Sequence, residues 1–184
     1  MICHSGGCPG SDMFWEAVCK EVNIKTISYS FPGHTQYGEH PRILTPAELN
    51  EGWQHILKAS KSIKRNADNM KSTYVRCLLC RNWFQVKNSD AIFAIGKINN
   101  NMVDGGTGWA VQMAIDENKP VFVFEQNKNI WYSWNYNTNL FEICDVPTLT
   151  ENFAGIGTRE LNKNGEDAIK NIIIKHFENE SKNI

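Results

Sequence analysis

The stretch DAIFAIGKINNNMVDGGTGWAVQMAIDENKPVFVF, residues 90–124, decides the fold class. Residues 90–96 and 120–124 are short, nearly unbroken apolar runs, which are typical of strands buried on both faces of a sheet. A glycine-rich turn at residues 104–108 follows the first run, and a helix is expected from Trp109 to about Glu117. Strand, turn, helix and strand in this order predict parallel strands joined through a helix.

The rest of the chain continues the same alternation. A further helix is expected to begin near Thr45, because Thr45 can cap it, Pro46 suits its first position and Glu48 lies three residues after the cap. Residues 33–45 and 126–150 are polar or aromatic and are expected to be loops. The other expected strands are residues 1–4, 24–29 and 153–157, and the other expected helices are residues 13–22, 72–86 and 161–177.

These elements predict one α/β domain over residues 1–184, a single Rossmann-like doubly wound parallel sheet with helices on both faces. Its 184 residues, 41% of them hydrophobic, suffice for one core and exclude disordered, collagenous and coiled-coil chains. No apolar run is long enough for a membrane span. The net charge of -1 argues against nucleic acid and anionic membrane as partners.

The cysteines and histidines favour neither a disulfide framework nor a metal site. No secretory leader precedes the first strand, so we expect a cytoplasmic, reducing location. Cys77 and Cys80 form a CxxC within an expected helix, and without a second ligand pair they are interpreted as buried apolar residues. The five histidines lack metal-binding spacing. We therefore expect neither a metal nor a cofactor.

Three glycine-rich turns fall at expected strand ends: SGGCPGSD at residues 5–12, GGTG at 105–108 and GIGTR at 155–159. In doubly wound sheets ligands bind at the carboxyl ends of the strands. Glycine allows the backbone to approach a ligand closely, and the following helix N-terminus can hold a phosphate without much positive charge. Each turn could also be a tight turn without a ligand, but three in one sheet favour a binding site.

At these turns the sequence resembles the SLOG superfamily, which unites Smf/DprA-type and Lonely-Guy (LOG) proteins. Residues 5–12 resemble its SGGxxGxD turn, residues 105–108 its PGGxGTxxE turn, and residues 155–159 the GSR-type end of its first strand. The resemblance leaves residues 33–70 and 126–150 unmatched. In typical relatives the GSR-type strand comes first, whereas here it comes last. The resemblance therefore implies a circular permutation that moves this strand and its helix to residues 153–177.

The resemblance places the catalytic acid of LOG enzymes at Gln112, and an amide cannot accept a proton. The chain is therefore expected to bind its ligand without cleaving it, although its status as an enzyme stays open. Asp12, Asp104 and Asp116 are the candidate replacement carboxylates. Asp12 could equally brace the first turn, and Asp116 could be an ordinary solvated acid.

Other residues are candidates because of where they stand. Arg159 suits a phosphate, His34 follows a strand, and Trp109 follows a phosphate-type turn where it could stack on a base or pack in the core. Trp131 and Trp134 could form a base-stacking wall or a dimer surface. The full set of expected ligand-binding residues is Ser5, Gly6, Gly7, Gly10, Ser11, Asp12, His34, Arg81, Asn82, Gln85, Gly105, Gly106, Thr107, Gly108, Trp109, Gln112, Thr158 and Arg159.

The sequence thus predicts a protein that binds, senses or sequesters a nucleotide-derived small molecule, such as an ADP-ribose- or NAD-like molecule or a cyclic nucleotide. An N-glycoside hydrolase or ribosyl-transfer enzyme is the alternative. A single-stranded DNA binder is a third possibility, which the near-neutral charge disfavours. Because relatives commonly form dimers, we expect a homo-oligomer.

Overall fold

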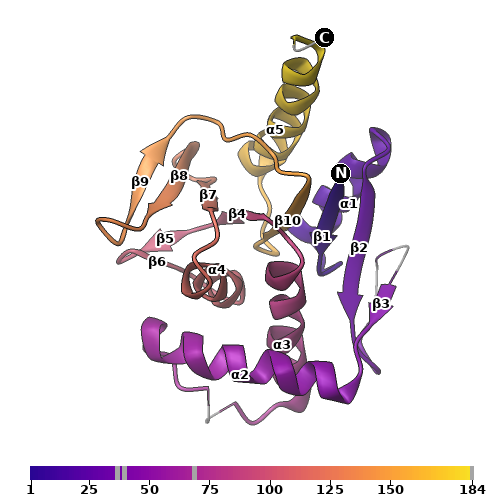
Figure 1. Cartoon of the computed structure of the whole chain (residues 1–184), viewed down its shortest axis with the longest axis vertical. Coiled ribbons are helices and arrows are strands. Elements are labelled where there is room, and N and C mark those ends of the chain that lie inside the picture. Colours follow the sequence, from indigo (N-terminus) through magenta and orange to yellow (C-terminus); the bar gives the residue numbers. More distant parts are fainter. Residues whose placement is uncertain (36–37, 39–40, 68–69, 183–184) are drawn as a thin grey trace.

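The apolar stretch at residues 91–96 forms a strand whose six residues are all buried, near the middle of an eight-stranded sheet. The computed structural model describes residues 1–35, 38, 41–67 and 70–182 (Figure 1). The strands of this sheet, in spatial order, are β3 (Pro41–Ile43), β2 (Lys25–Ser30), β1 (Ile2–Ser5), β10 (Asn152–Gly157), β4 (Ala91–Gly96), β7 (Val121–Glu125), β8 (Ile130–Asn135) and β9 (Leu140–Cys144).

In this spatial order, neighbouring strands from β3 to β7 pair in parallel. β8 pairs antiparallel with β7, and β9 pairs antiparallel with β8. In the described part of the chain five helices cover the sheet: α1 (Ser11–Glu21), α2 (Pro46–Ile63), α3 (Thr73–Lys87), α4 (Thr107–Asp116) and α5 (Lys163–Lys182). The predicted Rossmann-like α/β fold is confirmed.

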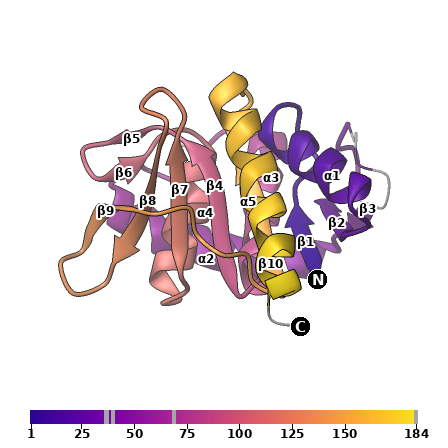
Figure 2. The ribbon, with the colours of Figure 1, turned by 90° about the horizontal axis from the view of Figure 1, so that it is seen from above.

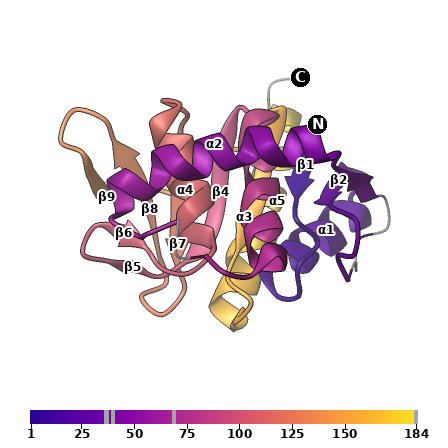
Figure 3. The ribbon, with the colours of Figure 1, turned by 90° about the horizontal axis from the view of Figure 1, so that it is seen from below.

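The helices divide between the two faces of the sheet, as predicted. α1 and α5 lie on one face (Figure 2), and α2, α3 and α4 lie on the other (Figure 3). The side chains of β4 alternate accordingly. Phe93 and Ile95 pack with the core under α1 and α5, whereas Ile92 and Ala94 pack with the core under the other three helices. Both faces are thus dry, which is why β4 is apolar at every position.

The position of β10 bears on the permutation. β10 pairs in parallel with β1 on one side and with β4 on the other, so the last strand of the chain lies at the centre of the sheet. If β10 is numbered 1, then β1, β2, β4 and β7 become strands 2 to 5. Their spatial order, β2-β1-β10-β4-β7, is then the doubly wound order 3-2-1-4-5. The adjacency that a permutation needs is present, and the permutation itself stays a prediction.

The two expected loops contain strands that the sequence analysis did not predict. Residues 126–150 hold the β8–β9 hairpin, because an aromatic run suits a pleated strand and Asn129 and Asn139 take positive φ at the turns. Residues 33–45 contain the short edge strand β3. Within that segment, residues 36–37 and 39–40, including His40, lie outside the described part of the chain, as do residues 68–69.

Local signals elsewhere agree with the structure. Thr45 and Glu48 form the predicted capping box at the start of α2. Cys77 and Cys80 lie on α3, and all six cysteines are free thiols. A small hairpin of β5 (Ile98–Asn99) and β6 (Met102–Val103) precedes α4. Among the described residues, no helix combines the length and apolar character that a membrane crossing requires.

Candidate functional site

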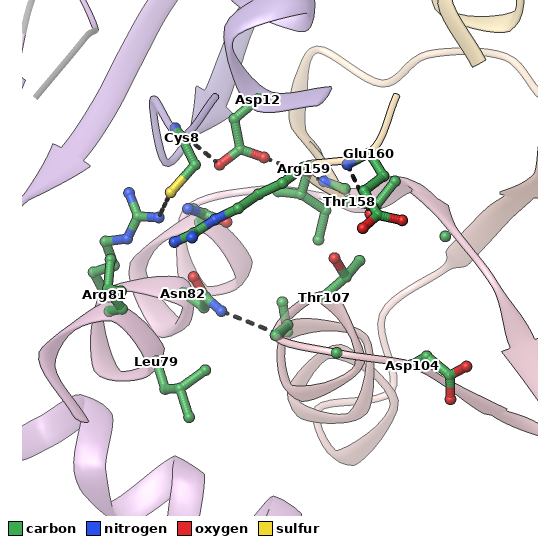
Figure 4. Close-up of a pocket in the computed structure, with 18 of the residues that line it drawn as sticks. Cys8, Asp12, Leu79, Arg81, Asn82, Asp104, Thr107, Thr158, Arg159 and Glu160 are labelled. Atoms are coloured by element: carbon green, nitrogen blue, oxygen red, sulfur yellow. Dashed lines mark hydrogen bonds between the residues drawn. The ribbon is translucent and has the colours of Figure 1, made fainter. Parts of the chain in front are cut away.

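A cavity of about 570 Å³ opens at the carboxyl ends of β1, β10 and β4 (Figure 4). Its volume lies within the range of small-molecule sites. It contains parts of all three glycine-rich turns: Cys8 and Asp12 after β1, residues 104–107 before α4, and residues 157–160 after β10. It lies where β10 and β4 adjoin and the helices that follow them leave to opposite faces, the position at which doubly wound sheets bind ligands.

One face of α3 forms a wall of this cavity. Val75, Leu78, Leu79, Asn82 and Gln85 line it at spacings of three and four residues. At a rise of 1.5 Å per residue this wall is about 15 Å long. Its apolar members lie toward the N-terminal end of α3, whereas Asn82 and Gln85 lie toward the sheet.

The N-terminus of α4 opens on the cavity without a side-chain cap. Gly106 is the N-cap residue, and Gly105, Gly106 and Thr107 line the cavity. Two guanidinium hydrogen bonds hold the turn: Arg65 donates to the carbonyl of Gly105 at 2.8 Å and to that of Val103 at 3.0 Å. Uncapped N–H groups and the helix dipole favour an anion at such an end.

The N-terminus of α1, in contrast, is occupied by the protein itself. Ser11 donates to the Thr158 carbonyl from its N–H at 3.0 Å and from its hydroxyl at 2.8 Å. Gly10 has φ of 94°, and a Cβ there would lie 2.4 Å from the Arg159 carbonyl oxygen. Gly10 therefore permits α1 to pack against the turn after β10 and does not contact the cavity.

The side chain of Asp12 links the turn after β1 to the turn after β10. Its carboxylate accepts the Gly157 N–H at 3.2 Å and the Cys8 N–H at 3.5 Å. Burial raises the pKa of Asp12 to about 6, while the charge of Arg81 acts in the opposite direction. Asp12 lines the cavity. A carboxyl group with this pKa can exchange protons near neutral pH.

Arg81 is almost fully buried and is bound to the β1–α1 turn. It donates to the carbonyls of Gly6 and Tyr29, and its Nη2 lies 2.9 Å from the Sγ of Cys8. Among the described residues, Arg81 Nε and Gln85 Nε2 have no hydrogen-bond partner. Buried donors in proteins are rarely left unpaired, so the floor of the cavity retains capacity for acceptor atoms.

Arg159 is exposed, and its side chain reaches across the cavity toward Asn82 (Figure 4). Asn82 in turn donates to the Gly106 carbonyl at 3.4 Å, next to the N-terminus of α4. The charged groups that line the cavity are nearly balanced in sign: Arg81, Lys97, Arg159, Asp12, Asp104 and Glu160. The free guanidinium of Arg159 and the end of α4 thus provide its main attraction for an anion.

Several predicted site residues lie outside the cavity lining. Trp109 is 6% exposed and packs in the core. Gln112 stands five residues after Thr107, about 140° around the helix, and donates to Asp116 at 2.8 Å. Gly108 lets α4 approach β6, since a Cβ there would lie 1.9 Å from the Val103 carbonyl oxygen. The remaining predicted residues outside the lining are Ser5, Gly6, Gly7, Gly10, Ser11 and His34.

Trp131 and Trp134 also lie away from the cavity. Trp131 is 5% exposed, and its ring centroid lies 5.3 Å from that of Phe124 in the core beneath α5. Trp134 packs edge-on against Phe141 at 5.0 Å. Both tryptophans stabilise the β8–β9 hairpin, so neither forms a wall for a ligand.

The predicted residues that do line the cavity are Asp12, Arg81, Asn82, Gln85, Asp104, Gly105, Gly106, Thr107, Thr158 and Arg159. The sequence analysis missed another group of lining residues: Cys8, Val75, Leu78, Leu79, Gly96, Lys97, Ala110, Ile156, Gly157 and Glu160. Most of these are apolar residues with helical or strand spacing, which sequence alone does not distinguish from core residues. Cys8, Gly157 and Glu160 lie inside or beside the glycine-rich turns, so their position in the sequence could have predicted them as lining residues.

Comparison with protein-family models, with curated proteins and with solved structures finds no match to this chain. In the part of the chain that the structure describes, no three His, Cys, Asp or Glu side chains form a group that could hold a metal ion.

Proposed function

We propose that this protein binds a nucleotide-derived small molecule, such as an ADP-ribose- or NAD-like molecule or a cyclic nucleotide, in the cavity at the carboxyl edge of its sheet. The observation that carries the proposal is the meeting of three glycine-rich turns around the uncapped N-terminus of α4. The cavity combines the apolar wall of α3 with polar groups beside this helix end, and typical small-molecule sites combine the same two features.

A phosphate group of the ligand fits at the N-terminus of α4. The N–H groups near Gly106 and Thr107 supply fixed donors, and the Arg159 guanidinium offers a planar fork that matches phosphate oxygens. Asn82 lies beside both. Since the cavity as a whole is nearly neutral, backbone amides and one arginine would provide the attraction instead of a basic patch.

The resemblance to the SLOG superfamily supports the same proposal. The turns that carry the resemblance surround one cavity, and β10 lies beside β1 as the proposed circular permutation requires. We retain the homo-oligomer as part of this proposal. Its surface would not be the aromatic segment at residues 126–136, where Trp131 is buried. The outer strand β9, with Leu140 and Ile143 exposed, offers the alternative.

Binding without cleavage is supported by the position of Gln112. The resemblance assigns the acid of LOG enzymes to this position, and here the residue is an amide that faces Asp116 away from the cavity. The protein would then act as a sensor, a carrier or a sequestering sink for its ligand.

Calorimetric titration with a panel of nucleotides tests the proposal. We expect saturable binding of at least one phosphate-bearing nucleotide, weakened roughly 10- to 100-fold by Arg159→Gln because a charge-assisted hydrogen bond is lost. Arg42→Gln is the matched control, since Arg42 lies outside this cavity and pairs with Glu48. Absence of binding across the panel, or equal loss in both variants, would contradict the proposal.

One observation favours a second candidate, an N-glycoside hydrolase or ribosyl-transfer enzyme. Asp12 lines the cavity with a pKa of about 6, which suits a general acid near neutral pH. Chromatography of nucleoside monophosphates or NAD incubated with the protein would detect the released base. Release that Asp12→Asn abolishes, while nucleotide affinity persists, would establish this function in place of simple binding.

A further inference from the structure

An aromatic cluster of Phe31, His34 and Tyr74 lies beside the cavity, next to the start of the wall that α3 forms. Phe31 stacks on His34 with ring centroids 4.8 Å apart, and Tyr74 meets Phe31 edge-on at 5.5 Å and His34 at 6.0 Å. Phe31 is 4% exposed and contacts both other rings, whereas Tyr74 is 42% exposed. Tyr74 therefore presents a large aromatic surface that the protein does not cover.

This cluster adjoins the wall of the cavity. Tyr74 immediately precedes Val75, which lines the cavity from the first turn of α3. Burial, together with the charges of the lining residues Arg81 and Arg159, lowers the pKa of His34 to about 4. His34 also shares a 2.8 Å hydrogen bond between its Nδ1 and the Ser30 hydroxyl. The ring is consequently neutral at pH 7 and fixed in place.

The distance along α3 matches a ligand with two chemically different ends. Tyr74 and Asn82 are eight residues apart, about 12 Å along the helix axis. Asn82 lines the cavity beside the N-terminus of α4, and Tyr74 lies just beyond the lining at the start of α3. Between them the wall is formed by Leu78 and Leu79, so it suits an uncharged middle portion.

We infer that Tyr74, supported by Phe31 and His34, is the platform on which the base of the bound nucleotide stacks. This inference rests on the proposed function and assigns the base to the part of the cavity beside Tyr74, with the phosphate at α4. Stacking on an aromatic face accepts any base, so Tyr74 would supply affinity for nucleotides over sugar phosphates without selecting one base.

Titrations of AMP and of ribose 5-phosphate, which lacks the base, test the inference. We expect the wild-type protein to bind AMP about fivefold or more tightly than ribose 5-phosphate, since stacking of one base on an aromatic ring contributes at least this much. Tyr74→Ala should abolish the preference for AMP and leave the affinity for ribose 5-phosphate unchanged. Tyr74→Phe should retain the preference, because it keeps the ring.

Tyr136→Ala serves as the control, since Tyr136 is a similarly exposed tyrosine on the β8–β9 hairpin, where neither it nor an adjacent residue lines the cavity. Equal affinity of the wild type for the two ligands, an unchanged preference in Tyr74→Ala, or a parallel loss of both affinities in that variant would each overturn the assignment of Tyr74 while leaving a binding protein. Failure of the wild type to bind either ligand or any nucleotide of the calorimetric panel would instead overturn the proposed function and the stacking platform with it.

Discussion

At the residue scale, the buried charges of the site hold the turns in place, and an exposed charge is left for the ligand. Asp12 accepts backbone N–H groups from two different turns, and Arg81 donates to the carbonyls of Gly6 and Tyr29. Both carboxylate oxygens of Asp12 and both terminal nitrogens of Arg81 are used in hydrogen bonds within the protein. Arg159 remains exposed and reaches into the cavity, so substitutions of Arg159 report on binding, whereas those of Asp12 and Arg81 also report on folding.

The contact between α1 and the turn after β10 is tested by Gly10→Ala. Gly10 and Gly33 both have positive φ, and a Cβ at Gly33 would meet no atom within 4 Å. We expect Gly33→Ala to lower the free energy of unfolding by about 1–2 kcal/mol through backbone strain. Gly10→Ala should cost about 1–3 kcal/mol more, because its Cβ overlaps the backbone of Arg159. Urea denaturation measures both, and equal losses would show that the contact is not tight.

At the element scale, the sequence predicted the elements that are uniformly buried or clearly capped. β4 and β7 were predictable because they are unbroken apolar runs, and α2 because of its capping box. The β8–β9 hairpin was not, since its strands are only partly buried and its polar and apolar residues do not alternate cleanly. Its turns carry a signal that was overlooked, namely asparagine in the left-handed region.

The sequence is rich in asparagine, with 21 of its 184 residues, and the turns explain part of this abundance. Among the described residues, seven non-glycine positions have positive φ, and all but Lys64 are asparagine. Asn100 and Asn101 form the turn between β5 and β6, and the others end helices or bound strands. Asparagine tolerates this conformation better than other non-glycine residues, so part of its excess reflects turn geometry.

The role of the hairpin is tested by Trp131→Ala. The side chain is buried against Phe124, so we expect a loss of about 3–5 kcal/mol in the free energy of unfolding and no change in AMP affinity of the protein that remains folded. Trp131→Phe should lose less, because it leaves a smaller cavity. Chemical denaturation and calorimetry give the two quantities. A loss of AMP affinity with unchanged stability would indicate that the indole contacts the ligand after all.

At the scale of the whole molecule, the site depends on the order of the strands. The three glycine-rich turns are separated by about 50 to 100 residues in sequence, and they meet because β10 inserts between β1 and β4. The turns themselves could be found in the sequence, since glycine patterns mark them. The roles of Arg65 and Leu79 could not be predicted from the sequence. Arg65 lies in a lysine- and arginine-rich segment that resembles ordinary surface, and Leu79 lies on an apolar helix face that resembles ordinary core.

Acid stability of the fold is predicted to depend on His4. Burial lowers its pKa from 6.5 to about 4, and it is 4% exposed, with its Nδ1 3.0 Å from the Tyr29 hydroxyl. The unfolded chain therefore binds a proton at a higher pH than the native protein, and stability falls as the pH drops from 6.5 toward 4.

Between pH 7.5 and 5 this effect of His4 amounts to about 2 kcal/mol. His4→Asn removes the titration and keeps an acceptor for the Tyr29 hydroxyl. Its stability should accordingly fall less over this interval than that of the wild type, while Asp12 and His34 titrate in both proteins and cancel in the difference. Denaturant titrations at the two pH values measure the difference. Parallel curves would show that His4 is accessible to protons in the native state.

The central claim is that the cavity at the carboxyl edge of the sheet is a nucleotide site. A crystal structure of the protein grown with a saturating concentration of AMP tests it most directly. We predict density for the phosphate at the N-terminus of α4, within hydrogen-bond distance of Arg159, and for the base against Tyr74. An empty cavity, or AMP bound elsewhere on the molecule, would contradict the claim.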